Sequence, residues 1–216
     1  YPAEGGGDIC WGCSNGVAAG NCLEEAIMQG FFELVERDAT AMWWYHRLRK
    51  PSVDLNRIGS PFAASVNAAM GEMGMRLEVL DLTHDLGIPV FSATLFEPED
   101  GGRLHSLGLG CHRDPRIALE RALGELGQCW GLADIDDYSL RFQGTPLSRE
   151  PFLKPDPDKP PKTLSDFSRG QSVDFLDDIE DSVGLLKDLG LEMLVMDLTR
   201  PDVGFPVVRV IIPGLM

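Results

Sequence analysis

The sequence lacks any long uninterrupted apolar run, and it is poor in basic residues. No stretch is long enough to cross a bilayer, and no secretory signal is recognisable. Against 34 Asp and Glu there are only 19 Lys and Arg, which gives a formal net charge of −15. Because a strongly acidic surface repels phosphate backbones and anionic lipid headgroups, we expect neither nucleic acid nor a membrane as a partner.

Cysteine is also scarce, and the cysteines form no regular framework. The chain has five of them: Cys10, Cys13, Cys22, Cys111 and Cys129. An odd number without regular spacing indicates reduced thiols, which is typical of a cytoplasmic protein. Cys10 and Cys13 make the one CxxC, in a glycine-rich stretch. A redox or zinc role for this pair is the minor alternative.

Several common catalytic and nucleotide-binding motifs are missing. There is no GxxxxGK[ST], no well-placed GxGxxG and no GxSxG. The four histidines lack metal-ligand spacing, and we expect them to be structural. The stretch SNGVAAG, residues 14–20, could hold phosphate through backbone N–H groups ahead of a helix. A plain glycine-rich entry into that helix is the alternative.

What is present is a mixture of helical and strand patterns over 216 residues, 44% of them hydrophobic. We expect an α+β protein, with a proline-rich loop at 151–163. Asn21 and Glu24 resemble a capping box at the first helix, and Phe175, Ile179, Val183 and Leu186 share one side of the last. The periodicity predicts helices at 22–49, 61–73, 114–130 and 174–189, and strands at 77–82, 89–95, 103–110, 191–198 and 205–212.

One internal repeat concerns the strands. Asp81-Leu82-Thr83 matches Asp197-Leu198-Thr199, and each triplet is followed by Gly-x-Pro, at Gly87 and Gly204. In both copies an apolar run ends at the triplet and another begins after the proline. The pattern predicts two antiparallel strand pairs, each joined by a short polar loop.

A second repeat concerns two helices separated by 92 residues. Each has an acid preceded by a small residue three positions earlier and followed by an acid or amide three positions later. The pairs are Ala26 and Ala118, Gly30 and Ala122, Glu33 and Glu125, and Glu36 and Gln128. Together the repeats predict an α/β sandwich with internal pseudo-symmetry, in which the small residues permit close packing and the two helices lie side by side.

The repeated carboxylates predict a metal and nucleotide site. Residues i and i+3 share a helix face, so two buried carboxylates there repel each other unless a cation lies between them. Mg²⁺ prefers carboxylate and phosphate oxygens, which makes Glu33, Glu36 and Glu125 candidate ligands. Gln128 could bind a base, ribose or metal, and Arg37 a phosphate. The alternative is a half-exposed face with salt bridges to Arg37 and Arg121.

Long stretches of the sequence resemble the YcaO domain family, over about residues 10–215. They are SNGVAAGNCLEEAIMQGFFELVERDA, WWYHRLRKP, LDLTHDLGIPVF, GLGCHRDPRIALERALGELGQ and VMDLTRPDVGFPVVRVIIPGL. The resemblance implies ATP- and Mg²⁺-dependent phosphorylation of a peptide backbone amide, which leads to azolines or thioamides in ribosomally made natural products. It also implies a precursor peptide and a partner protein that recruits it or supplies sulfur, and it leaves a homodimer open.

The resemblance carries the nucleotide and metal roles to particular positions. Glu33 and Glu36 fall in the helix motif that contains ERD, and Glu125 and Gln128 fall in ALxELxQ. Ser14, Asn15, Arg37 and Arg209 are further candidates for ATP binding. The alternative function is a non-catalytic YcaO-like scaffold that binds a precursor peptide or a partner protein.

The resemblance also implies segments that these residues do not include. A Ser-x-x-x-Glu-x-x-Glu-Arg motif is expected before the SNG stretch, and a tail is expected after PGL. We therefore expect residues 1–216 to be a single YcaO-like domain that is incomplete at the N-terminus and at the C-terminus. We predict that the isolated chain neither binds nor hydrolyses ATP well; calorimetry that shows tight binding of ATP–Mg²⁺ would contradict this.

Overall fold

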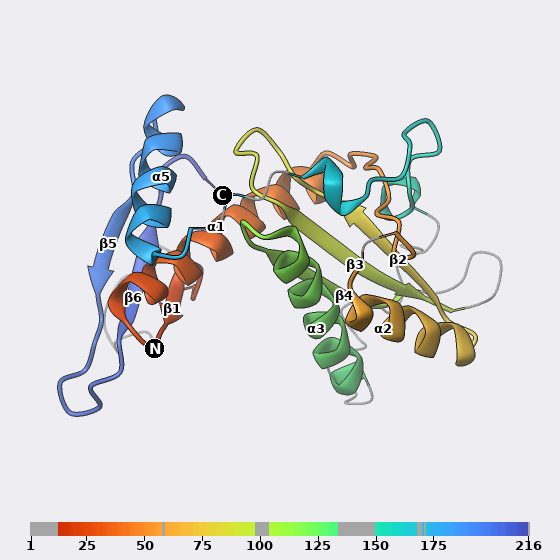
Figure 1. The fold of residues 1–216 in the computed structure, drawn as a ribbon, viewed down its shortest axis with the longest axis horizontal. Helices are drawn as coiled ribbons and strands as arrows, with labels where there is room; N and C mark the ends of the chain where they lie inside the picture. The colour runs from red at the N-terminus through yellow and green to blue at the C-terminus, as the bar shows by residue number, and fades with distance from the viewer. Residues whose placement is uncertain are drawn as a thin grey trace, which may run out of the picture. The chain divides into compact units, whose positions relative to one another are not determined.

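The computed structural model describes residues 13–57, 59–97, 104–133, 150–167, 170 and 172–215. Within them lie two three-stranded antiparallel sheets and four α-helices, which confirms the expected α+β class (Figure 1). The chain divides into two compact units. Unit 1 comprises residues 1–34 and 174–215, and unit 2 comprises residues 35–173. That residues 1–216 make a single domain stays a prediction.

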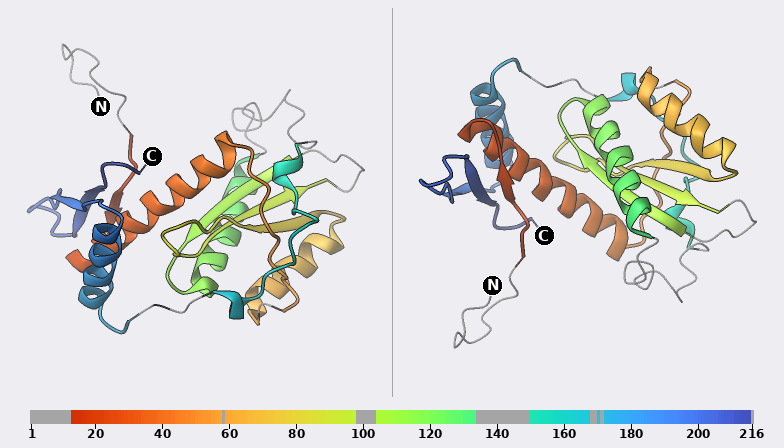
Figure 2. Two further views of the ribbon diagram at one scale, coloured as in Figure 1. Left: turned by 90° about the horizontal axis from the view of Figure 1, so that it is seen from above. Right: turned by 90° about the horizontal axis from the view of Figure 1, so that it is seen from below.

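Unit 2 contains a sheet in the order β2-β3-β4, with strands Arg76–Asp81, Val90–Phe96 and Leu104–Cys111. Helices α2 (Pro61–Glu72) and α3 (Pro115–Ala133) pack against this sheet, and their apolar side chains form one core cluster with those of β2 and β3. Strand β3 is buried along its whole length, as expected for the central strand. Figure 2 shows α3 running along β4.

Unit 1 contains the second sheet, in the order β1-β6-β5. Its strands are Val17–Ala19, Val207–Ile211 and Leu194–Asp197, in that order across the sheet. Helix α5 (Phe175–Asp188) and the first turns of α1 (Leu23–Tyr45) complete the unit. The remainder of α1 belongs to unit 2, so a single helix continues through the division.

The two units have the same strand order, which confirms the internal pseudo-symmetry. Among the described α-helices and strands a β-α-α-β-β order occurs twice, first as β1-α1-α2-β2-β3 and then as β4-α3-α5-β5-β6. In space, however, β4 joins β2 and β3, whereas β1 joins β5 and β6. Each sheet therefore takes two strands from one sequence repeat and its third from the other.

The repeated Asp-Leu-Thr loops form the same backbone hydrogen bonds. The N–H of Leu82 donates to the carbonyl of Val90, and the N–H of Leu198 donates to that of Val207, both at 2.8 Å. In each loop the Asp carboxylate accepts the N–H of the Thr two residues later, at 2.9 and 2.8 Å. Each loop also places its glycine at positive φ, 67° and 68°. The predicted antiparallel pairs are thus confirmed in both copies.

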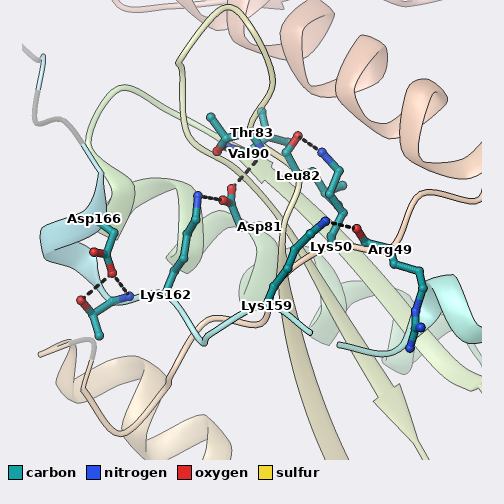
Figure 3. Close-up of polar contacts among 10 residues, drawn as sticks. Arg49, Lys50, Asp81, Leu82, Thr83, Val90, Lys159, Lys162 and Asp166 are labelled. Carbon is teal, nitrogen blue, oxygen red and sulfur yellow. Dashed lines mark hydrogen bonds and ion pairs between the residues drawn. The ribbon is translucent and has the colours of Figure 1, made fainter. Parts of the chain in front are cut away.

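The loops differ in what surrounds the aspartate. Figure 3 shows the surroundings of Asp81. The Asp81 side chain is only 3% exposed, and its carboxylate lies 2.6 Å from Nζ of Lys162. Lys50 donates to the carbonyl of Leu82 at 3.4 Å. Burial lowers the pKa of Lys50, as do the nearby ammonium groups of Lys159 and Lys162, while Asp81 opposes the shift. Asp81 therefore provides negative charge within a group of lysines.

Helix α1 is shorter than predicted at both ends. It begins at Leu23, and Glu25, not Glu24, accepts the backbone N–H of Asn21 at 2.7 Å. It ends at Tyr45, not near residue 49. The N–H of Leu48 donates to the carbonyl of Trp43, and Arg47 has φ 53°, which is a left-handed C-terminal cap. Because the left-handed position is Arg47 and not glycine, residue types alone do not predict this cap.

The buried side of α5 also differs from the prediction. Phe175 and Val183 are 38% and 43% exposed, whereas Asp178, Ser182 and Leu186 are buried. Ser182 Oγ donates to the carbonyl of Asp178 at 2.7 Å, so a polar group on the buried side is satisfied. Apolar spacing therefore located the helix but not the face that packs.

The proline-rich stretch is irregular, as predicted, apart from a short turn of 3₁₀ helix at its start, η2 (Pro151–Leu153). Phe152 and Leu153 are buried there, and Trp43 Nε1 donates to the carbonyl of Phe152 at 3.0 Å. A second such turn, η3 (Leu164–Asp166), follows the stretch. The loop is thus tied to α1 and contributes to the core of unit 2.

The repeated aspartates provide a matched test of burial. We expect Asp81→Asn to lower the free energy of unfolding by about 2 kcal/mol, because it leaves the Lys162 ammonium without its carboxylate in a partly desolvated site. Asp197→Asn removes the equivalent exposed carboxylate and should change stability little. Urea denaturation at pH 7 measures both, and equal losses would contradict the argument.

Candidate functional site

Glu33 on α1 is held against the backbone that leads into β1. A Cβ atom at Gly30 would lie 2.7 Å from the Gly16 carbonyl oxygen and 2.8 Å from a methyl of Val210, so only glycine permits this approach. Gly16 itself has φ 77°. The carboxylate of Glu33 accepts the N–H of Gly16 at 3.1 Å. One carboxylate oxygen is therefore oriented by the main chain.

Glu125 on α3 is held in the same way against β4. A Cβ atom at Gly108 would lie 2.2 Å from the Leu126 nitrogen and 2.3 Å from the Ala122 carbonyl oxygen. The carboxylate of Glu125 accepts the N–H of Leu109 at 2.7 Å. The small residues of both helices thus lie where the helix backbone meets another segment of the sheet unit: Gly30 meets Gly16, and Ala122 meets Gly108 of β4. In both repeats a backbone N–H in or next to a strand orients the acidic side chain.

Glu36 lies one turn after Glu33 and is half-buried in unit 2. Its charge acts on Arg121 of α3 and on Cys111 at the end of β4. Burial raises the pKa of the Cys111 thiol well above its ordinary value, Glu36 raises it further, and Arg121 opposes the shift. Burial lowers the pKa of Arg121, whereas the charges of Cys111 and Glu36 oppose that shift. That Glu33 and Glu125 also lie side by side stays a prediction.

Arg37 and Gln128 flank these carboxylates in sequence. Arg37 lies 3.8 Å from Glu36, and both side chains are partly buried. This contact belongs to the salt-bridged alternative, although a distance this long between partly exposed groups adds little stability. Gln128 is exposed on α3, one turn after Glu125. The ligand-binding roles of Arg37 and Gln128 stay predictions.

Ser14, Asn15 and Arg209 all belong to unit 1, where Arg209 contacts residues on either side of Ser14 and Asn15 in sequence. Strands β1 and β6 pair so that Val17 lies opposite Arg209, and a guanidinium nitrogen of Arg209 lies 3.8 Å from the Cys13 sulfur. The Nε of Arg209 is buried and has no hydrogen-bond partner in the described part of the chain. An unpaired buried guanidinium N–H beside a glycine-rich stretch is suited to an anionic ligand.

Sequence reasoning treated Arg121 only as a salt-bridge partner. The structure places its guanidinium 3.0 Å from the Cys111 carbonyl and near the charge of Glu36. The available signal was its spacing, because Arg121 lies four residues before Glu125 on one helix face. Arg121 thus adds a cation to the carboxylates of unit 2.

His84 was expected to be structural, and its contacts agree with that. Its side chain is 6% exposed, Nδ1 lies 2.7 Å from Asp85, and Nε2 lies 3.7 Å from Asp38 of α1. The hydrogen bond with His84 lowers the pKa of Asp85. Nε2 has no hydrogen-bond partner among the described residues. His84 therefore links the loop after β2 to α1.

The candidate metal ligands do not form a complete cage. No group of three His, Cys, Asp or Glu in the described ranges is arranged to hold a metal ion. Mg²⁺ commonly takes one or two carboxylates and completes its shell with water and phosphate. Within unit 1, the carboxylate of Glu33, oriented by the Gly16 N–H, and the Nε of Arg209 each have the chemistry that such a magnesium–phosphate group needs. The metal roles of Glu33, Glu36 and Glu125 stay predictions.

The CxxC alternative falls partly outside the described residues, because Cys10 is not among them. Cys13 is exposed, and Cys13, Cys22, Cys111 and Cys129 are free thiols. Burial, followed by the charge of Glu125, raises the pKa of Cys129. This disfavours the thiolate at that position. A search of the helices in the described residues finds none long and apolar enough to span a membrane.

Adding one methyl group tests the strand–helix contact. We expect Gly108→Ala to lower the free energy of unfolding by about 2–3 kcal/mol, because the new Cβ meets backbone atoms of α3 that cannot rotate away. The matched control is Gly124→Ala on α3, the helix that Gly108 of β4 contacts, because a Cβ at Gly124 would meet no atom within 4 Å. This control should raise stability slightly through helix propensity. Urea denaturation compares them, and a neutral effect of Gly108→Ala would contradict the contact.

Comparison with solved structures relates this chain to heterocyclases and to a YcaO protein. A heterocyclase in complex with substrate and cofactor matches the whole chain at 42% identity and a TM-score of 0.91, and the chain covers 30% of it. YcaO from Methanopyrus kandleri, bound with AMPPCP and Mg²⁺, matches 97% of the chain at 26% identity and a TM-score of 0.78, with 57% of that protein covered.

Sequence comparison agrees with the structural matches. An uncharacterised protein from Methanothermobacter thermautotrophicus is 32% identical over 231 residues, which cover 99% of this chain and 58% of that protein. The chain thus spans less than two thirds of these longer proteins. The family model described as YcaO cyclodehydratase, ATP- and Mg²⁺-binding, matches residues 1–216. The chain therefore belongs to the YcaO cyclodehydratase family.

Proposed function

We propose that this chain is part of an enzyme that uses ATP and Mg²⁺ to activate a peptide backbone amide. The observation that carries the proposal is a contact that occurs in both repeats. The carboxylate of Glu33 accepts the N–H of Gly16, and the carboxylate of Glu125 accepts the N–H of Leu109. Each glutamate is presented with one oxygen already fixed, as a ligand for a hard cation should be. The cofactor, when bound, supplies the phosphoryl group that turns the amide oxygen into a leaving group.

The residues divide between the roles that this chemistry needs. We propose Glu33, Glu36 and Glu125 as Mg²⁺ ligands, and Gln128 as a contact to nucleotide or metal. Ser14, Asn15 and Arg209 of unit 1 would bind phosphate oxygens through hydroxyl, amide and guanidinium groups. Arg37, and with it Arg121, would offset negative charge beside Glu36. No residue is assigned as the base that activates the attacking nucleophile.

The substrate in this proposal is a ribosomally made peptide or protein in the cytoplasm. The heterocyclase that matches the whole chain was solved with a substrate and a cofactor, and the Methanopyrus protein with AMPPCP and Mg²⁺. Attack by a Cys, Ser or Thr side chain gives an azoline, and attack by an external sulfur nucleophile gives a thioamide. A partner protein would recruit the peptide or supply the sulfur, and the enzyme could act as a homodimer.

The competing function is a scaffold that binds the peptide or a partner without catalysis. A scaffold needs no oriented carboxylates, yet both repeats retain them with the same kind of backbone contact. Burial of a carboxylate costs free energy, and a bound cation would offset that cost. We therefore favour catalysis over the scaffold.

Removing one charge without changing shape separates these functions. In the full-length protein that contains residues 1–216, Glu33→Gln should reduce ATP consumption by at least about 100-fold. The reason is that an amide is a poor Mg²⁺ ligand but still accepts the Gly16 N–H. Glu24→Gln, on the same helix outside the candidate set, is the control and should retain activity. ATP turnover and melting temperature are measured together. Full activity of Glu33→Gln would support the scaffold.

Mass spectrometry of the peptide product identifies the reaction. After incubation of a candidate peptide with ATP and the longer protein, we expect each modified residue to lose the mass of one water, which indicates an azoline. Replacement of an oxygen atom by sulfur would instead raise the mass by the difference between the two atomic masses, and this would indicate a thioamide. A product of unchanged mass with either nucleophile present would contradict amide activation of that peptide.

A further inference from the structure

The outer edge of β5 in unit 1 has no partner in the described part of the chain. Strand β5 is the last strand of the order β1-β6-β5, and no isolated bridge reaches it. An edge of this kind presents a row of backbone N–H and carbonyl groups that can pair with another extended segment. The pseudo-symmetric strand of unit 2, β2, shows what such a segment looks like.

In unit 2 the outer edge of β2 is covered by residues 51–53. The N–H of Asp81 donates to the carbonyl of Pro51 at 3.0 Å, and the N–H of Val53 donates to that of Val79 at 2.8 Å. Ser52 lies opposite Leu80 in an antiparallel bridge. A three-residue segment is therefore enough to satisfy this edge.

On β5 the equivalent carbonyl and N–H groups point outward. The Asp-Leu-Thr repeat relates β2 to β5 by 116 positions, so Val79 and Asp81 correspond to Val195 and Asp197. The N–H of Leu198 donates inward to Val207, as that of Leu82 does to Val90. Since backbone groups alternate along a strand, the carbonyl of Val195 and the N–H of Asp197 face outward. Neither group has a hydrogen-bond partner among the residues that the structure describes.

The side chains of β5 are as uncovered as its backbone. Met196 and Leu198 are 52% and 40% exposed, whereas their counterparts Leu80 and Leu82 are fully buried. Val195 is 44% exposed, against 2% for Val79. All four residues of β5 are exposed, and three of them, Leu194, Val195 and Met196, are apolar. A surface of this kind normally marks a contact with another chain segment.

The charge around β5 indicates the chemistry of the occupant. Residues 174–202 contain nine acidic side chains and two basic ones, Lys187 and Arg200, and Arg200 forms an ion pair with Asp202 at 2.7 Å. Most of the acids on α5 are exposed. A second copy of this chain would bring the same negative surface to the edge, which repels it. A strand with basic residues would be attracted.

We propose that the outer edge of β5 binds an extended peptide in which apolar and basic side chains alternate. The peptide runs antiparallel to β5, donates to the Val195 carbonyl and accepts the Asp197 N–H, as residues 51–53 do on β2. This is β-strand addition, in which main-chain bonds give affinity and side chains give selectivity. The inference rests on the proposed function only in taking the occupant to be the peptide substrate.

Binding of a defined peptide to the longer protein tests the proposal. The probe is a fluorescently labelled peptide of sequence KVTVKVTVK, and its control is EVTVEVTVE, which has the same apolar pattern with opposite charge. Fluorescence anisotropy should show at least about tenfold tighter binding of the basic peptide. Added salt should weaken that binding. Hydrogen exchange of the Asp197 amide should slow when the basic peptide is bound.

Two substitutions at one position locate the site. Val195→Pro places a ring on the outward edge but removes no hydrogen bond to β6, so a folded variant is expected. Val195→Pro should lower the affinity for the basic peptide at least about tenfold, while Val195→Thr should leave that affinity unchanged. Unchanged binding by Val195→Pro, or no protection of the Asp197 amide in the wild-type protein, overturns the proposal. ATP consumption is measured in parallel, so failure of the enzyme and failure of this edge are distinguished.

Discussion

The structure depends on the close approach of a helix to a strand where neither backbone has a side chain between them. Gly16 and Gly30 make this contact in unit 1, and Gly108 and Ala122 make it in unit 2. Because the backbones nearly touch, the acid one turn further along each helix reaches a strand N–H. A larger residue at these positions would push the helix away from the backbone that it contacts, and so would move the carboxylate away from its N–H partner. The same close packing therefore stabilises the fold and positions the candidate site.

The repeats show how one local design is used in different surroundings. Both Asp-Leu-Thr loops have the same hydrogen bonds and a glycine at the same φ, so the loop itself does not require its neighbours. Yet Asp81 is buried beside Lys162, whereas Asp197 is exposed. The edges of β2 and β5 differ in the same way, one covered and one open. The environment, more than the motif, therefore separates a structural copy from one available for binding.

The interleaving of the repeats explains why the chain does not divide at the repeat boundary. Strand β4 begins the second β-α-α-β-β sequence but completes the sheet of the first, and β1 completes the sheet of the second. Long-range pairings of this kind, such as Val17 with Arg209, bring together residues from the two ends of the sequence. Arg209 reaches the SNG stretch only through that pairing.

Local periodicity and residue type at fixed spacing were enough to predict the α+β class, the approximate positions of the strands, the two repeats and the candidates Glu33, Glu36, Glu125 and Gln128. They could not predict that Asp178 and Ser182, not Phe175 and Val183, lie on the buried face of α5, or that Arg121 lies near Glu36. The tertiary structure decides these features, and it also decides which Asp-Leu-Thr loop is buried. The reason is physical: burial and electrostatic environment are set by neighbours that are distant in sequence, and identical motifs do not encode them.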